Sequence, residues 1–187
     1  MAKQTWGPSS ILSPLPAVIV TVRGKDGRDN AITIGWTGTV CSDPAMCFIS
    51  VRKERFSHHM LMKSGEFVIN LTTTKMARAT DYIGVRSGRD EDKIEKTGLH
   101  KEEARKVNCC ILKESPISIE CKVKSVTELG SHDMFLAEVL AVDVDEDYLD
   151  DKGRLMLEKA DLMAYTHGMY FELGKYIGKF GFSVKKK

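Results

Sequence analysis

The hydrophobic positions fall mainly into short β-branched runs or strict alternations, a pattern that predicts strands. The first two runs flank the turn signal Asp26-Gly27, so we expect them to pair as a hairpin. A small-residue loop and the Asp43-Pro44 turn place the third run close to the second. Strands are predicted at 17–22, 31–36, 46–51, 67–71, 117–124 and 134–144.

Capping residues predict two short helices between these strands. Ser57 as N-cap and Gly65 as stop signal delimit a helix over 58–64. Thr74 is expected to cap a second helix, which ends at Gly84. The next stretch, 86–105, is charged and broken by glycines, and it is predicted to be a surface excursion with one or two helical turns around 92–96.

The connections between strands decide the fold class. They are mostly short, and no regular βαβ alternation is present. This pattern argues against a doubly wound parallel sheet and favours a mainly β fold, an antiparallel barrel or sandwich with a few attached helices. A chain of 187 residues most simply forms one domain, so 1–187 is predicted to be a single domain.

The charge balance requires no polyanionic partner, because 28 basic and 26 acidic side chains leave a net charge of +2. We expect neither nucleic acid nor a membrane as partner, and we interpret the triplet Lys185-Lys186-Lys187 as a solvated tail. Met1 to Ser13 is polar and does not resemble a secretory signal, and no apolar run approaches the length of a membrane span. A cytoplasmic location is therefore expected.

The cysteines predict no disulfide framework, because their number is odd and no CxxC occurs. They are interpreted as reduced, small core residues. A reactive thiol at Cys109 or Cys110 is the alternative. The five are Cys41, Cys47, Cys109, Cys110 and Cys121.

A basic group precedes the first predicted helix. Arg52, Lys53 and Arg55 lie just before Ser57, where hydroxyl and helix amide groups also converge. Cations and free amides at a helix start suit a phosphate. The three cations alternate around a strand end, so they cannot all point one way. The alternative interpretation is a solvated charged turn.

The segment before Asp43 is rich in small residues, which leave backbone amides accessible. A planar heteroaromatic ring with several acceptors could lie against this edge, held mainly by main chain. Trp36 either flanks that ring or is a core or interface aromatic. The segment contains Thr33, Gly35, Thr37, Gly38 and Thr39.

Other catalytic signatures are missing. No HExxH and no Cys/His ligand spacing occurs, so no metal site is predicted. No Ser/His/Asp order or carboxylate pair stands out. His132 lies in a predicted loop beside Gly130 and Asp133, where it either faces a ligand or is simply exposed.

Taken in order, the predicted strands, the small-residue segment, the basic group and the segment around His132 resemble the flavin reductase-like family of FMN-binding split-barrel proteins, in particular its flavoredoxin and ferric-reductase-like branch. The resemblance covers nearly the whole chain. It implies an antiparallel Greek-key split barrel that works as a homodimer with FMN near the subunit interface. Its most specific stretches are NAITIGWTGTVCSDP, FISVRKERFSHHM, GEFVINL, GSHDMFLAEV and THGMYFELGKYIGKFGFSV.

The resemblance also implies roles for individual residues. His132 matches a histidine of a Gly-Asp-His element that faces the nicotinamide cofactor in some members, although Ser131 is inserted here. The isoalloxazine ring and ribityl chain would contact Thr33, Ile34, Gly35, Trp36, Thr37 and Thr39. The FMN phosphate would contact Ser50, Arg52, Lys53, Arg55 and Ser57.

Three functions remain open on this basis. The first is an FMN-binding oxidoreductase that takes hydride from NAD(P)H and passes electrons to flavin, ferric iron or another acceptor. The second is a flavoredoxin-like electron carrier that a protein partner reduces without NAD(P)H. The third is a binding module that holds flavin or a heme-like ligand without turnover. For the first two, the cofactor carries the redox chemistry, so the lack of a catalytic triad is expected.

Overall fold

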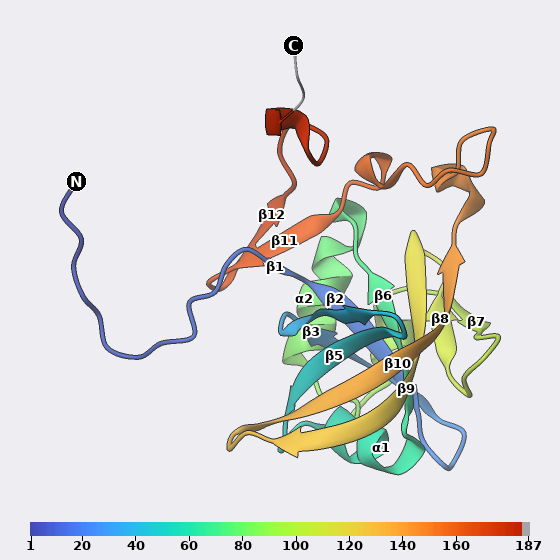
Figure 1. The fold of residues 1–187 in the computed structure, drawn as a ribbon. Coiled ribbons are helices and arrows are strands. Elements are labelled where there is room, and N and C mark those ends of the chain that lie inside the picture. Colours follow the sequence, from blue (N-terminus) through green and yellow to red (C-terminus); the bar gives the residue numbers. More distant parts are fainter. Residues whose placement is uncertain (185–187) are drawn as a thin grey trace.

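The computed structural model describes residues 1–184 and is built mainly from antiparallel strands (Figure 1). The lysine triplet interpreted as a solvated tail lies outside the described residues. The strands are β1 (Leu15–Pro16), β2 (Val18–Arg23), β3 (Asp29–Ile34), β4 (Thr37–Ser42), β5 (Ala45–Arg52), β6 (Glu66–Leu71), β7 (Lys101–Glu103), β8 (Cys110–Leu112), β9 (Ile117–Glu128), β10 (His132–Val144), β11 (Met163–Thr166) and β12 (Met169–Glu172). The mainly β prediction is confirmed.

The largest sheet has the order β3-β2-β6-β9-β10-β5-β4, and its neighbours all pair antiparallel. Its two edge strands, β3 and β4, are joined only by Gly35 and Trp36. The sheet must therefore roll up until its edges meet. The Ser50 N–H donates to the Trp36 carbonyl oxygen at 2.9 Å, which extends the β4–β5 pairing into the β3–β4 connection.

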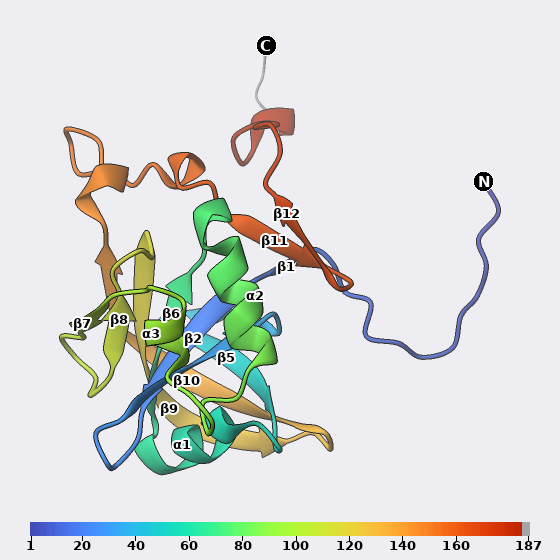
Figure 2. The same ribbon diagram turned by 180° about the vertical axis from the view of Figure 1, so that it is seen from behind.

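Both faces of the first hairpin are buried. Alternate residues of β2, such as Val18 and Val20, point into the barrel core, whereas Ile19 belongs to a second cluster outside it. That second cluster packs under α2 (Ala77–Val85) and α3 (Lys93–Lys96), which cover the outer face of β2 and β3 (Figure 2). Helix α1 (Phe56–Ser64) covers one end of the barrel.

Asn70 on β6 ties the strands together from a fully buried position. Its amide nitrogen donates to the Ile19 carbonyl and the Thr21 hydroxyl. Its amide oxygen accepts from the Leu112 N–H and the Ser118 hydroxyl. A buried amide with all its partners satisfied specifies a single arrangement of the strands around it.

The predicted helix starts need correction. Ser57 is not an N-cap: α1 begins at Phe56, Arg55 takes the cap position, and no side chain caps the helix. The Ser57 hydroxyl is buried and accepts from the Asn30 side-chain amide at 2.8 Å, so a distant residue uses the oxygen that a cap would need. The stop at Gly65 is confirmed, because its φ is 68° and its N–H donates to the Leu61 carbonyl.

The second predicted helix is also displaced. Thr74 begins a 3₁₀ turn rather than capping α2, and α2 runs through Gly84 to Val85. The predicted helical turn near 92–96 is confirmed as α3, with Asp92 as its cap.

Two strand predictions were incomplete. The stretch interpreted as a small-residue loop forms the edge strand β4. His132 and Asp133 belong to β10 and not to a loop, because β9 and β10 extend to a tight connection through Gly130, whose φ is 87°. Their long hairpin therefore carries His132 at a strand end with a fixed register.

Four of the cysteines are buried as predicted, whereas Cys41 is partly exposed. Contact with the Cys109 thiol and burial raise the pKa of Cys110, which argues against the alternative of a reactive thiolate there. Within residues 1–184, the structure contains no helix that is both long and apolar enough to span a membrane.

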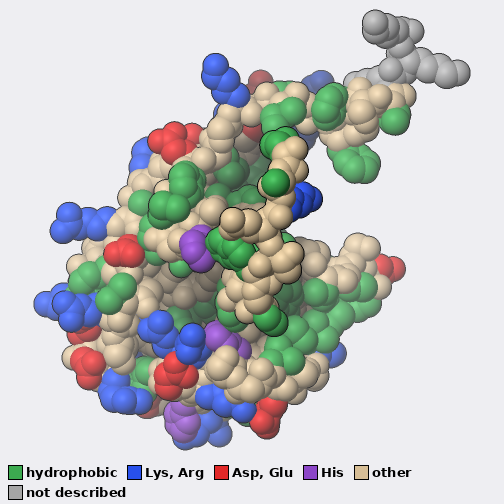
Figure 3. Space-filling model, turned by 90° about the vertical axis from the view of Figure 1, so that its left-hand side faces the viewer, with side chains coloured by type: hydrophobic (Ala, Val, Ile, Leu, Met, Phe, Trp, Pro, Cys, Tyr) green, Lys and Arg blue, Asp and Glu red, His purple; other side chains and the backbone are tan. Residues whose placement is uncertain are grey.

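Both terminal segments project from the barrel, with hydrophobic side chains along them (Figure 3). The N-terminal arm precedes β1, and the C-terminal segment follows β12. Strand β1 pairs with β11, which pairs with β12, so a small sheet connects both segments to the barrel. Exposed apolar side chains on these segments include Trp6, Leu12, Tyr176, Ile177 and Phe180.

Candidate functional site

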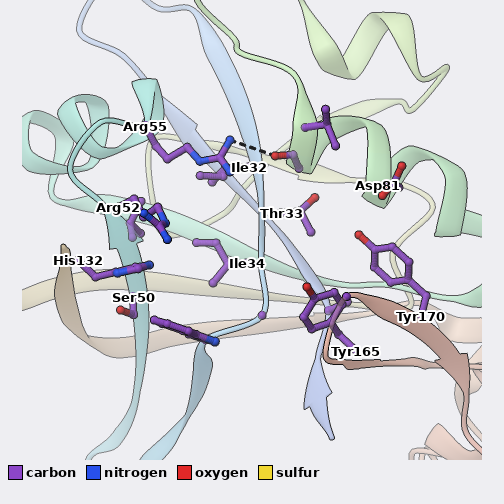
Figure 4. A pocket seen from close by; sticks show the side chains of 17 residues that line it. Ile32, Thr33, Ile34, Ser50, Arg52, Arg55, Asp81, His132, Tyr165 and Tyr170 are labelled. Atoms are coloured by element: carbon purple, nitrogen blue, oxygen red, sulfur yellow. Dashed lines mark hydrogen bonds between the residues drawn. The ribbon is translucent and has the colours of Figure 1, made fainter. Parts of the chain in front are cut away.

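A cavity of about 420 Å³ opens where the barrel, α2 and the β11–β12 hairpin meet (Figure 4). Its size falls in the usual range for small-molecule sites. The predicted site residues that line it are Thr33, Ile34, Gly35, Trp36, Ser50, Arg52, Arg55 and His132.

The register between β5 and β10 brings part of this group together. His132 lies opposite Arg52, and Met134 lies opposite Ser50. Because side chains alternate along a strand, Ser50 and Arg52 share one face of β5 and both reach the cavity. Figure 4 shows Arg52, Arg55, His132 and Ser50 gathered on one side of it.

Four predicted residues do not line this cavity. The Thr37 hydroxyl donates to the Phe48 carbonyl oxygen at 2.6 Å, and Thr39 is exposed on the edge strand β4. Lys53 points to the other face, where its ammonium group lies 2.9 Å from Glu128 and 3.3 Å from Asp133. Ser57 instead lines a neighbouring cavity.

The two arginines are the cations available to a ligand. The Arg52 guanidinium pairs with the Glu54 carboxylate at 3.4 Å, and both side chains are more than half exposed to solvent. Arg55 donates to the Gly84 carbonyl at 3.1 Å, which orients its guanidinium across the cavity (Figure 4). Such weakly engaged guanidinium groups retain donors for an anion.

His132 lies beside the ring of Trp36, with ring centroids 4.6 Å apart and planes tilted by 32°. Burial lowers the pKa of His132, and the nearby Arg52 charge lowers it further. The imidazole is therefore neutral near pH 7. Trp36 is 39% exposed, so it is a wall of the cavity and not a core aromatic.

The opposite wall was not predicted. Asp81 comes from α2, and Tyr165 and Tyr170 come from β11 and β12. The two phenol rings meet edge to face, 5.5 Å apart. Burial and the Asp81 charge raise the pKa of Tyr170 to about 12, so its hydroxyl stays protonated as a donor. The sequence signal was the aromatic-rich C-terminal stretch, to which no role was given.

The cavity is thus polarised along its length. Arginines lie at one end, a carboxylate and two phenols at the other, and the β3 main chain with Trp36 and His132 between them. This arrangement suits an elongated ligand with a flat head and an anionic tail. Among residues 1–184, no group of three or more His, Cys, Asp or Glu side chains could hold a metal ion.

Comparisons with known proteins bear on the family and the fold. The family model of the flavin reductase like domain matches residues 12–174. The structure of flavoredoxin from Desulfovibrio vulgaris (Miyazaki F) is 28% identical, has a TM-score of 0.91 and covers 98% of this chain and 100% of its own. An FMN-binding protein from Thermus thermophilus, solved with 1-cyclohex-2-enone, is 25% identical with a TM-score of 0.79, and the match covers 96% and 99% of the two chains.

A third structure bears on the fold alone. It is a protein from Shewanella frigidimarina assigned as a flavin reductase with a split barrel domain, 19% identical with a TM-score of 0.81, and the match covers 90% of this chain and 86% of that one. Together with the sheet order, it confirms the predicted antiparallel split barrel.

The position of Arg52 beside His132 gives a test of the site's electrostatics. We expect Arg52→Ala to raise the pKa of His132 toward its ordinary value, because the substitution removes a neighbouring positive charge. An NMR titration of the His132 ring measures this shift. Arg78→Ala, on α2, is the matched control. An unchanged His132 pKa in Arg52→Ala would contradict this account.

Proposed function

We propose that this chain, which belongs to the flavin reductase-like domain family, is an FMN-binding oxidoreductase that passes electrons from NAD(P)H to flavin, ferric iron or another acceptor. The observation that carries the proposal is the polarised cavity, with Arg52 and Arg55 at one end and a flat main-chain and aromatic wall beyond them. Family membership supplies the reaction class, since flavin chemistry needs a bound ring and no catalytic triad.

The arginine end fits the phosphate of FMN. Guanidinium groups form paired, charge-assisted hydrogen bonds with phosphate oxygens. Ser50 lies on the same face of β5 as Arg52 and adds a hydroxyl. Lys53, which was predicted to join this group, is engaged by Asp133 and Glu128, so we assign the phosphate to the two arginines and Ser50.

The remaining wall fits a flat ring. Gly35 leaves room for close approach of main chain, and Trp36 offers an aromatic edge or face. The Tyr170 hydroxyl, which burial and the neighbouring Asp81 keep protonated, lies at the far end. When bound, FMN supplies the redox chemistry, taking up hydride from NAD(P)H and passing electrons onward.

We assign His132 to the nicotinamide side of the site. Its imidazole is neutral, so it does not repel a cationic nicotinamide ring, and stacking on Trp36 holds its plane. The Ser131 hydroxyl lies 2.9 Å from its Nδ1 and fixes the ring further. His132 thus acts by positioning, and the site needs no proton from it.

A second candidate function is electron transfer without NAD(P)H. The likeness to flavoredoxin, with a TM-score of 0.91 over nearly the whole chain, supports it. Here a protein partner would reduce the flavin, and the exposed rim of the cavity would be the docking surface.

We also propose that the chain forms a homodimer. Large apolar side chains on the terminal segments are largely exposed, for example Ile177 at 89% and Phe180 at 102%. Clusters of exposed large hydrophobic residues mark interaction surfaces. The N-terminal arm also lies beside Trp36 and Tyr165 of the cavity wall, so a second copy that packs on this arm would shield the site.

The phosphate assignment predicts weaker FMN binding when either arginine is removed. Arg52→Ala and Arg55→Ala should each raise the Kd of FMN about tenfold or more, because each removes a charge-assisted contact. Riboflavin, which has no phosphate, should bind all variants alike. Isothermal titration measures both ligands, with Arg78→Ala as control. Equal FMN affinity in the two single variants and the double variant would rule out the assignment.

The proposed reaction predicts that NADH or NADPH alone bleaches the flavin absorbance of the holoprotein. Anaerobic stopped-flow mixing at neutral pH measures this rate for each nucleotide. If neither nucleotide reduces the flavin while a chemical reductant does, NAD(P)H dependence is wrong and the electron-carrier function is favoured.

The dimer proposal predicts a two-chain mass in sedimentation equilibrium. Ile177→Ser together with Phe180→Ser should shift the equilibrium toward monomer, because the two substitutions remove apolar area that the dimer would bury. Met62→Ser, at an exposed position on α1, is the matched control and should leave the mass unchanged. A monomeric wild-type chain at micromolar concentration would contradict the dimer.

A further inference from the structure

A separate cavity, of about 650 Å³, lies on the other flank of α2 from the flavin cavity. Helix periodicity explains the separation, because successive residues advance by about 100° around the axis. Arg78 and Tyr82 line this cavity, whereas Asp81 and Gly84 line the flavin cavity. Ile83 points between the two flanks into the second core cluster. Helix α2 therefore rests on the core with one cavity on each side, and the two share no lining residue.

Four segments enclose this α2–α3 cavity. Helix α2 with the 3₁₀ turn before it forms one side, and the end of α3 forms the next (Figure 2). Glu114, between β8 and β9, and Tyr148, in a 3₁₀ turn over Glu146–Tyr148, complete the wall. Met76 and Leu99 give it an apolar base that continues the second core cluster. The volume suits a ligand of nucleotide size.

The charges around the cavity are mainly positive. Lys75 and Arg78 lie three residues apart in one continuous helical stretch, so they are neighbours on one face, and Lys96 ends α3 beside them. All three residues are exposed. The ion pairs found among residues 1–184 use other cations. Their donors are therefore available to an anion.

The one carboxylate among the described lining residues has a partner outside the cavity. Glu114 accepts from the His100 N–H at 3.2 and 3.1 Å, and its Oε1 lies 2.6 Å from the His100 Nδ1. It offsets at most one of the three cations, so a net positive charge remains. Helix α2 also begins here without a side-chain cap or an acidic residue in its first turn, and its dipole adds to the positive field.

Two tyrosine rings supply flat surfaces in the same wall. The Tyr82 hydroxyl lies 3.0 Å from each carboxylate oxygen of Glu91, to which it donates, and this contact holds its ring in place. Tyr148 approaches from the segment after β10, and both residues are partly buried. Aromatic faces of this kind stack on nucleobases and other planar rings.

We propose that the α2–α3 cavity binds a nucleoside phosphate. The phosphate groups contact Lys75, Arg78 and Lys96, and the base lies against the two tyrosine rings. A ligand with one carboxylate would leave most of the cationic charge unused, and inorganic phosphate would leave the rings and the apolar base uncovered. This site is independent of the flavin cavity, so Arg78 has no part in FMN binding.

The shared helix places the two ligands on opposite flanks of one element. The Arg55 guanidinium, at the phosphate end of the flavin cavity, donates to the Gly84 carbonyl oxygen of α2 at 3.1 Å. A nucleotide in the α2–α3 cavity contacts the same helix one turn or more earlier, at Arg78 and Tyr82.

The test titrates ADP into the FMN-saturated protein by isothermal titration calorimetry, so that FMN already covers Arg52 and Arg55. ADP should bind more tightly than adenosine or pyrophosphate, because only ADP engages both the rings and the cations. Lys75→Glu and Lys96→Glu should each raise the Kd of ADP about tenfold or more, because each removes a charge-assisted contact. Lys63→Glu, at an exposed position on α1, is the matched control.

Two further measurements separate a lost contact from a lost fold. FMN affinity should be the same in the wild-type chain and in both lysine variants. Tyr148→Leu should weaken ADP binding about fivefold or more and leave pyrophosphate binding unchanged, because it removes only a stacking surface.

Several outcomes would overturn the inference. They are an absence of ADP binding, equal affinities for ADP and pyrophosphate, and unchanged ADP affinity in both lysine variants. If ADP competes with NADH or NADPH and the lysine variants raise the KM of that nucleotide, the cavity holds the co-substrate and the inference is also wrong. If FMN does not bind, the proposed function fails, whereas ADP titration of the same chain and variants still decides this inference.

Discussion

The pairing of β5 with β10 is the constraint on which the site depends. Asp133 is buried on β10, where it lies 2.7 Å from His58 of α1 and 3.3 Å from Lys53. These contacts set the register, because a slip of one residue would turn Asp133 toward the cavity and His132 into the protein. A buried carboxylate without its partners is costly, so the register is strongly specified.

The same register sorts the basic residues by strand alternation. Lys53 neutralises Asp133 on one face, while Arg52 is left toward the cavity with only the exposed Glu54 beside it. Lys53, which pairs with Asp133, therefore does not draw Arg52 away from the cavity. These cations, which lie within four residues of sequence, thus have two separate tasks. The pKa of His132 is lowered by burial and, in addition, by the Arg52 charge on the cavity side.

Local sequence patterns predicted the central strands, the first hairpin, Gly65 and most of the arginine end of the cavity. They failed where a distant residue decided the outcome. Ser57 looked like a cap, but Asn30 takes its hydroxyl, and β4 lacks an apolar alternation because it is an edge strand. Asp81, Tyr165 and Tyr170 meet only through the docking of α2 and the C-terminal hairpin, which no local pattern encodes.

The absence of a Ser57 cap on α1 affects the charge at the site. Because the Ser57 hydroxyl holds Asn30, the first-turn amides of α1 have no side-chain acceptor, and no acidic residue lies in that turn. The positive end of the helix therefore adds to the field of Arg52, Arg55 and Arg86. So much like charge in one region opposes folding unless an anion binds there. An anion bound in this region would therefore stabilise the folded protein.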